Sequence, residues 1–411
     1  MREEDIPGSG FAITAYTVHR ELGGDAALAR LRERLRQRDL RLMLDFVPNH
    51  MAPDHPWVGQ HPDYFVGWSE SDQAREPQNY FHVSTAKGPR VFACGRDPYF
   101  SGWPDTIQLN YGNPALQEAM IGELVRIAGQ CDGVRCDMAM LILPEVFQRT
   151  WGIAAQPFWP KATQRVSGHV PDFCFMAEVY WDLEWTLQQQ GFDYAYDKRL
   201  YDRLREGYAR PVREHFRAGL DYQDKLARFL ENHDEPRAAA TFAPDQHTAA
   251  AVLTFLSPGL RFFHQWQFEG RLKRISPHLG RSPDEPVNST VAQFYEGLLD
   301  VLRRPAVRNG QWQLLECAPA WDGNRSFGAF IACAWCEPDG ERLIVAVNYA
   351  AQQSQCYVQL PFANLDRGQW RLEDLLGDAR YDRDGRELQS RGLYLDIAPW
   401  QHHAFEMSSL S

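Results

Sequence analysis

Three carboxylic acids, Asp137, Glu178 and Asp234, stand where short apolar stretches of the sequence end. Cleavage of a glycosidic bond needs two such groups, an ionised carboxylate at the anomeric carbon and a protonated acid that gives a proton to the leaving oxygen. Arg135 precedes Asp137 by two residues, so both side chains leave a strand on the same face. Because a neighbouring guanidinium favours the ionised carboxylate, Asp137 is the predicted nucleophile.

Glu178 follows the apolar residues 173–177. Apolar surroundings raise the pKa of a carboxyl group and keep it protonated, which predicts that Glu178 is the general acid. Each residue also has a plain structural interpretation. Arg135 and Asp137 can form an ion pair without chemistry, His50 and His233 can be hydrogen-bonded residues at strand ends, and Asp45 lies inside a strand.

The elements that must bring these residues together alternate along the chain. From about residue 24 to residue 274, helical patterns alternate with short strand-like runs, which predicts a parallel α/β architecture. Strands are expected at residues 41–47, 133–138, 173–179, 192–196, 226–230 and 260–263. Charged residues at the carboxyl ends of successive parallel strands are typical of an active site on a (β/α)8 barrel.

Two further changes of pattern indicate the domain organisation. A long segment rich in Pro, Gly and aromatic residues, about 51–111, predicts a loop subdomain inserted in a catalytic barrel of residues 1–304. Strand-like runs separated by turn residues then predict an antiparallel β-sandwich domain over residues 305–411.

Composition excludes several classes of partner. The net charge of -11 argues against nucleic acid, and the arginines of residues 30–41 alternate with leucines as on a solvated helix face. No apolar run is long enough to span a membrane. The eight cysteines include Cys333 and Cys336 but no zinc pattern, and no apolar signal region opens the chain, which predicts a cytoplasmic protein. The oligomeric state stays open.

Five stretches together resemble the motifs of the α-amylase family, glycoside hydrolase family 13. They are DFVPNH at 45–50, WPDTIQLN at 103–110, GVRCD at 133–137, FMAE at 175–178 and FLENHD at 229–234. The resemblance implies action on an α-glucan or α-glucoside by a retaining mechanism, in which the two carboxyl groups stand roughly 5–5.5 Å apart.

The resemblance also implies a role for each matching residue. Asp137 is the nucleophile, Glu178 the acid/base and Asp234 the residue that holds the sugar hydroxyls as the oxocarbenium develops. The residues implied to line the sugar subsite are His50, Arg135, His233 and Phe11. No cofactor is required. Calcium stays open, because Asn49 falls where many relatives place a ligand.

One departure from the family concerns the start of the barrel. The strand, helix and strand that the family places before the segment matching residues 8–16 are not found, so an N-terminally incomplete barrel of six strands is expected. Two alternatives to hydrolysis follow. A transglycosylase or glucanotransferase would use the same residues with a sugar acceptor, and an amylase-like protein without catalysis would only bind sugar.

Overall fold

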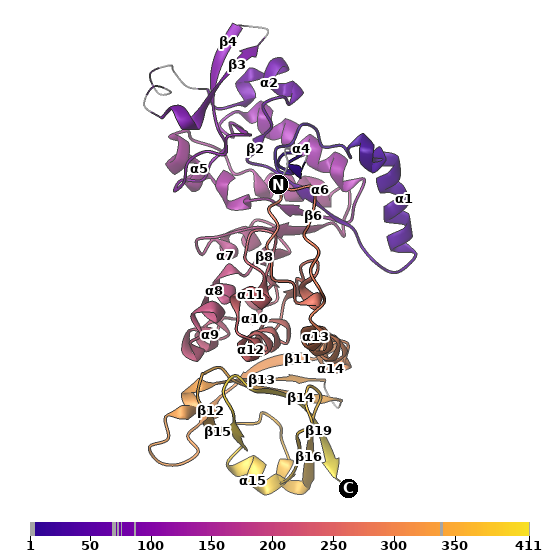
Figure 1. Ribbon diagram of the computed structural model, residues 1–411, viewed down its shortest axis with the longest axis vertical. Helices are drawn as coiled ribbons and strands as arrows, with labels where there is room; N and C mark the ends of the chain where they lie inside the picture. The colour runs from indigo at the N-terminus through magenta and orange to yellow at the C-terminus, as the bar shows by residue number, and fades with distance from the viewer. Residues whose placement is uncertain are drawn as a thin grey trace. The chain divides into compact units, whose positions relative to one another are not determined.

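The computed structural model describes residues 5–67, 71, 74, 76–85, 88–337 and 340–410. Residues 1–4 of the N-terminus, in which no signal region is predicted, lie outside the described residues, as do 68–70, 72–73, 75 and 86–87 of the predicted loop subdomain. The chain forms two compact units, Met1–Tyr196 with Pro277–Arg281, and Asp197–Ser276 with Ser282–Ser411. Figure 1 follows the chain through both by colour.

A parallel sheet forms the centre of the first unit. Its strands pair in the order β1 (Met43–Phe46), β6 (Gly133–Cys136), β7 (Cys174–Ala177) and β8 (Tyr194–Tyr196). Every residue of β6 is buried, which explains why this strand appears in the sequence as a continuous run rather than an alternating one. Because the strands are parallel, the residues that follow β1, β6 and β7 emerge at the same edge.

Helices of the first unit connect these strands. They are α1 (Gly24–Arg36), α4 (Pro114–Ala128), α5 (Pro144–Trp151), α6 (Trp159–Ser167) and α7 (Glu184–Gln189). The helix α4 begins at Pro114 because the side chain of Asn113 accepts a hydrogen bond from the backbone of Ala115. In α1 only Leu28 is buried, and Arg30, Arg34 and Arg36 are exposed as expected of a solvated helix face, whereas Arg32 is largely covered and donates to Asp132.

The segment between β1 and α4 has secondary structure of its own. The strands β2 (His50–Met51) and β5 (Ile107–Gln108) pair antiparallel, and β3 (Tyr80–Thr85) forms a hairpin with β4 (Gly88–Ala93). Figure 1 shows this hairpin near the short helix α2 (Pro56–Gln60). The strands β2 and β5 stand at the two ends of the inserted segment, so their pairing holds these ends together.

The second unit begins with helices and two further parallel strands, β9 (Leu226–Arg228) and β10 (Leu260–Arg261). With them, all six strands expected from the sequence pattern are present. The helices are α8 (Lys198–Glu206), α9 (Ala209–His215), α10 (Leu220–Gln223), α11 (Ala238–Thr241), α12 (Pro244–Phe255), α13 (Ser289–Leu302) and α14 (Pro305–Asn309).

Two antiparallel sheets complete the second unit. The larger has the order β11-β13-β14-β19-β16-β17 and the smaller the order β12-β15-β18. The bounds are β11 (Gln311–Leu315), β12 (Cys317–Ala318), β13 (Phe330–Cys336), β14 (Arg342–Asn348), β15 (Ser354–Val358), β16 (Gln369–Asp374), β17 (Arg380–Asp384), β18 (Leu393–Ile397) and β19 (His402–Leu410), with the helix α15 (Gly385–Ser390) between β17 and β18. The predicted antiparallel β-structure is confirmed, and the domain boundary after residue 304 stays a prediction.

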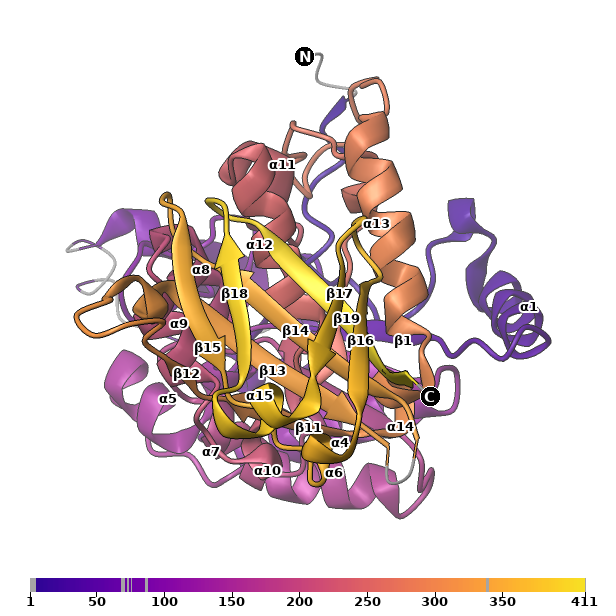
Figure 2. The same cartoon turned by 90° about the horizontal axis from the view of Figure 1, so that it is seen from below.

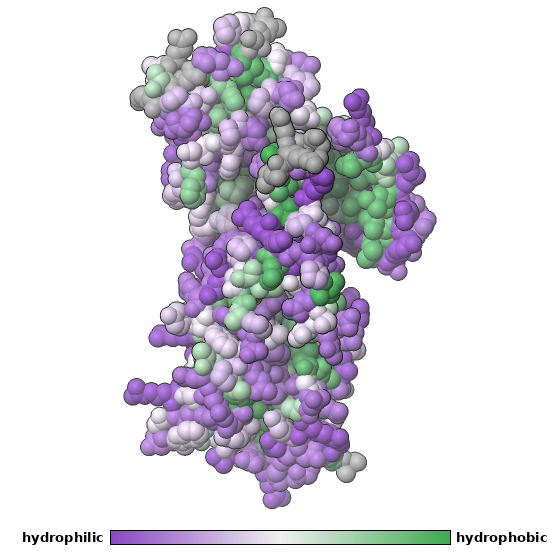
Figure 3. All heavy atoms as spheres, viewed as in Figure 1, coloured by the Kyte–Doolittle hydropathy of each residue, from purple (hydrophilic) through white to green (hydrophobic). Residues whose placement is uncertain are grey.

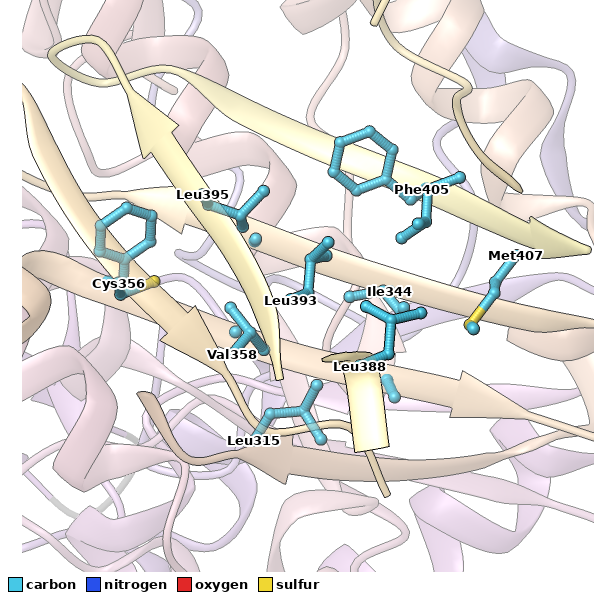
Figure 4. Packing of buried hydrophobic residues seen from close by; sticks show 14 of the residues in the cluster. Leu315, Ile344, Cys356, Val358, Leu388, Leu393, Leu395, Phe405 and Met407 are labelled. Atoms are coloured by element: carbon cyan, nitrogen blue, oxygen red, sulfur yellow. The ribbon is translucent and has the colours of Figure 1, made fainter. Parts of the chain in front are cut away.

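The two antiparallel sheets enclose one hydrophobic core. In β18, Leu393, Leu395 and Ile397 are buried while the residues between them are exposed, as expected of a strand with one face on a core. Figure 2 shows β15 and β18 side by side in front of the larger sheet. Figure 4 shows side chains of both sheets, such as Val358 and Ile344, pointing into this core.

The surface is mostly polar on the face that Figure 3 shows, with apolar side chains gathered on α1. Among the described residues, no helix combines the length and the apolar character that crossing a membrane requires.

Candidate active site

One guanidinium group joins three carboxylates at the carboxyl edge of the first unit's sheet. Arg135, in β6, is 6% exposed, and its Nη1 donates to Asp45 Oδ1 at 2.8 Å and to Asp137 Oδ1 at 2.9 Å. Its Nη2 donates to Glu178 Oε2 at 2.7 Å. The planar fork of an arginine suits such contacts, because its donors are fixed in direction. Asp137 and Glu178 therefore bind the same guanidinium, a contact that the sequence motifs did not predict.

Asp137 is the first residue after β6, and its backbone N–H donates to Phe46 at 2.9 Å, which continues the ladder to β1. Burial and the nearby Glu178 raise the pKa of Asp137 to about 7, although Arg135 acts to lower it. The expected effect of the guanidinium, which favours the ionised carboxylate, is present but does not decide the net shift of this pKa. Removal from water and a second carboxylate outweigh the ion pair.

Glu178 follows β7 and accepts three hydrogen bonds. Besides Arg135, the backbone N–H of Met138 donates to Oε2 and the Tyr180 hydroxyl donates to Oε1, both at 2.8 Å. Met138 reaches this position with a left-handed backbone (φ 42°), which is uncommon for a residue other than glycine. The apolar surroundings expected for Glu178 are present along β7 but not around its carboxyl group, which is buried among polar donors.

Two other predicted site residues belong to this unit. Phe11 contacts Arg135 of the cluster, and His50 lies in β2, the strand that follows β1. The ring of Phe11 is 5.4 Å from the Arg135 guanidinium carbon. His50, in β2, is buried, and its ring lies 5.1 Å from that of Trp103. Burial lowers the pKa of His50 to about 4, so its imidazole is neutral at pH 7 and can donate a hydrogen bond without carrying charge.

Asn49, the residue left open as a calcium ligand, is held by hydrogen bonds, and calcium binding there stays a prediction. Its Oδ1 already accepts a hydrogen bond from Gln108 Nε2 at 3.0 Å, and its Nδ2 lies 3.3 Å from His50 Nδ1. Calcium prefers several oxygen ligands, carboxylates above all. Within the described part of the chain, no group of three His, Cys, Asp or Glu side chains is placed to hold a metal ion.

His233 and Asp234 lie together on a turn of the second unit. Asn232 accepts hydrogen bonds from the backbone of Asp234 at 2.9 Å and of Glu235 at 2.8 Å, which fixes this turn after β9. His233 Nε2 is 3.0 Å from Asp234 Oδ2. Their approach to Asp137 and Glu178 of the first unit stays a prediction.

The sequence interpretation missed three residues of the cluster. Asp45 stands opposite Arg135 in the register of β1 and β6, and its carboxylate is 55% exposed. Tyr196 ends β8, and Arg135 Nε donates to its hydroxyl at 3.3 Å. Tyr180 stands two residues beyond Glu178. A signal existed for two of them, because strand alternation places Tyr180 on the side of Glu178 and Tyr196 closes a predicted strand.

Comparisons with known proteins found a family model and several relatives that match this chain. A family model described as "Alpha amylase, catalytic domain" matches residues 5–285. Among curated proteins, α-amylase MalA of Haloarcula japonica is 23% identical over 71% of this chain and 41% of its own length. The trehalose synthase/amylase TreS of Mycobacterium tuberculosis is 32% identical over 33% of this chain and 23% of its own length. The chain therefore spans less than two thirds of these relatives.

Solved structures show the same fold. The maltogenic α-amylase AmyB of Thermotoga neapolitana superposes with a TM-score of 0.72 at 18% identity, over 98% of this chain and 86% of that one. At 18% identity this similarity is evidence for the fold alone. It confirms the predicted fold class, a parallel α/β barrel type followed by an antiparallel β-domain.

Proposed function

Because the chain belongs to the α-amylase family, we propose that it is a retaining glycoside hydrolase of α-glucans or α-glucosides. The observation that carries the proposal is the single guanidinium of Arg135, which holds both Asp137 and Glu178 after neighbouring parallel strands. The two groups need different protonation states, one ionised and one protonated. Burial, together with the nearby Glu178, raises the pKa of Asp137 to about 7.

The proposed reaction has two steps. In the first, the carboxylate of Asp137 attacks the anomeric carbon, the glycosidic C–O bond breaks, and the proton of Glu178 passes to the leaving oxygen. In the second, Glu178 takes a proton from water, the water oxygen attacks the anomeric carbon, and the ester bond to Asp137 breaks. We assign Asp234 to the sugar hydroxyls, and Phe11, His50, Arg135 and His233 to the same sugar, on the family motifs.

Transfer to a sugar acceptor is the second candidate. The match to a protein named trehalose synthase/amylase favours it, since the same intermediate can react with water or with a sugar hydroxyl. Products longer than the donor would identify transfer. A cytoplasmic location remains a prediction alongside this activity.

Proton NMR of anomeric signals tests the proposal on malto-oligosaccharides and an aryl α-glucoside. We expect the α-anomer to appear first, and Asp137→Asn to lower kcat by roughly 10⁴-fold, as loss of one essential catalytic group does. The exposed Asp172 of the same unit provides the matched control, because it precedes β7 and so lies at the opposite end of that strand from Glu178. Initial release of the β-anomer, or full activity of Asp137→Asn, would refute the proposed mechanism. Sugar binding without turnover would favour the alternative of an amylase-like protein that only binds sugar.

A further inference from the structure

Two buried charged residues, Glu231 and Arg237, flank the turn that carries His233 and Asp234, and the proposed reaction uses neither of them. Glu231 is 1% exposed and Arg237 is 2% exposed. Arg237 Nη1 donates to Glu231 Oε1 at 2.6 Å, and the backbone N–H of Ala238 donates to Oε2 of the same carboxylate at 2.8 Å. A single carboxylate therefore holds the two ends of the turn together. Burial of two charges costs free energy, so such a pair is better explained by the conformation that it fixes than by stability.

The same guanidinium also binds the segment that follows β10. Arg237 Nη1 donates to the backbone carbonyl of Gln265 at 2.7 Å, and its Nε donates to that of Lys273 at 3.3 Å. The imidazole of His264 lies beside the ion pair, with its Nδ1 2.9 Å from Arg237 Nη1 and 3.0 Å from Glu231 Oε1. Since the guanidinium only donates and the carboxylate only accepts, a neutral ring can give its Nδ1 proton to Glu231. Hydrogen bonds thus connect the turn after β9 with the segment after β10.

The segment after β10 is in turn hydrogen-bonded to two helices of the same unit. The backbone N–H of His264 donates to Gln267 Oε1 at 3.1 Å, and Gln267 Nε2 donates to the hydroxyl of Tyr295, in α13, at 2.9 Å. His247 Nε2, in α12, lies 3.0 Å from the same hydroxyl. The side chains of Gln267, Tyr295 and His247 are all buried. A buried polar network whose members find partners is rigid, so the turn after β9 is held on a firm support.

The two residues that the turn carries are far less covered than its supports. The side chain of His233 is 28% exposed and that of Asp234 is 43% exposed. An exposed side chain on a turn loses conformational freedom when it is ordered, and a misplacement of about 1 Å can cost a large part of the rate. We propose that Glu231 and Arg237 are positioning residues, which hold the backbone of this turn so that Asp234 is placed for the sugar before the substrate binds. The proposal rests on the proposed function, in which Asp234 is assigned to the sugar hydroxyls.

Steady-state kinetics on an aryl α-glucoside test the positioning role. Arg237→Ala should lower kcat by about 10²-fold and change KM by no more than about threefold, because Asp234 acts on the oxocarbenium rather than on the bound substrate. Arg237→Lys keeps the buried cation without the fork, so it should fold even where the alanine variant does not, and it should lower kcat by about tenfold. Full kcat in Arg237→Lys and Arg237→Ala would overturn the proposal.

A double substitution separates positioning from a general weakening of the fold. If Arg237 acts through Asp234, replacing Arg237 by Lys or Ala should lower kcat by no more than about twofold once Asp234 is already Asn. Losses that multiply with the loss of Asp234→Asn would overturn the proposal. Arg304→Ala is the matched control, because it removes a cation that pairs with Glu341 and Glu406 in the same unit. It should leave kcat unchanged.

Hydrogen exchange gives a second readout that needs no turnover. The backbone N–H groups of Asp234 and Glu235 both donate to Asn232, and in Arg237→Lys these two amides should exchange at least about tenfold faster, whereas Arg304→Ala should not change them. Unchanged exchange in the Arg237 variant would overturn the proposal whether or not the chain is active. If the unaltered chain turns over no donor while exchange rises as expected, the proposed function fails and the role of Arg237 in holding the turn is supported.

Discussion

At the scale of single residues, the guanidinium of Arg135 binds three carboxylates that differ in their access to water. Asp45 is half exposed, whereas Asp137 and Glu178 are buried. Each negative charge near Asp137 makes its ionisation harder, and Asp45 contributes to the raised pKa of Asp137. A residue that seemed purely structural from its position inside a strand is therefore expected to tune the nucleophile.

The acidic limb of the pH profile provides a test of this tuning. The unaltered enzyme should gain kcat/KM as pH rises through about 7, because Asp137 must lose its proton to attack. Asp45→Asn removes a charge that raises the pKa of Asp137 and frees Arg135 for it, so the limb should move to lower pH. The profile of kcat/KM reports the free enzyme and is the quantity to measure. Asp172→Asn should leave the limb in place, and a shift of Asp45→Asn to higher pH would contradict the assignment.

At the scale of elements, a buried ion pair connects two helices with a strand of the second unit. Asp197 caps α8 by accepting from the backbone of Leu200 at 3.0 Å, and it is paired with Arg228 of β9 and with His215 of α9. Burial acts to raise the pKa of Asp197, but His215 and Arg228 outweigh it and hold the pKa well below its usual value. Its stabilising effect is therefore present above the unfolded pKa of about 3.9 and is lost as pH falls toward the lower folded value.

Breaking this pair should strongly destabilise the second unit. Arg228→Ala leaves the carboxylate of Asp197 buried without its main cation, and we expect the free energy of unfolding to fall by about 3–5 kcal/mol. Urea unfolding followed by circular dichroism measures this change. Arg217→Ala removes an exposed partner of Glu316 and should have little effect. Equal stability of the two variants would show that the buried ion pair does not stabilise the second unit.

At the scale of the whole molecule, the β-sheets of the second unit are tied to its helices by hydrogen bonds to helix ends. The indole of Trp335 donates to the carbonyl of Leu256 at 2.7 Å, at the end of α12. The hydroxyl of Tyr349 donates to the carbonyl of Leu204 at 2.7 Å, in the last turn of α8. The Leu256 carbonyl lies at the C-cap of α12, and the Leu204 carbonyl also accepts from the backbone N–H of Gly207 at the end of α8. This arrangement explains why helices and sheets form one compact unit.

Loss of these hydrogen bonds should lower the free energy of unfolding of the second unit. Trp335→Phe removes the indole donor of the Leu256 carbonyl and should lower the free energy of unfolding by about 1–3 kcal/mol. Tyr349→Phe should lower it less, because the Leu204 carbonyl keeps the backbone N–H of Gly207 as a donor. Hydrogen exchange should then speed up at α8 and α12 as well as in the sheet. Tyr394→Phe, on the partly exposed face of β18, is the control and should change little. Faster exchange confined to the strands would argue against the coupling.

The sequence by itself determined the order and type of the elements and the residues that end them. The strand before Glu178, β7, is an unbroken apolar run, and the strand before Asp137, β6, is interrupted only by Arg135, so both were identifiable from local pattern. The alternation of β18 likewise identified an antiparallel strand. Local composition carries this information because burial acts on each residue separately.

Only the tertiary structure decided what surrounds each charged group. The contact of Asp45 with Arg135 depends on strand register, and the donors around Glu178 come from Met138 and Tyr180 with specific backbone angles. The pKa of Asp137 depends on burial and on a second carboxylate from another strand. Electrostatic energy follows distance and access to water through space, and neither quantity is written in the spacing of residues along the chain.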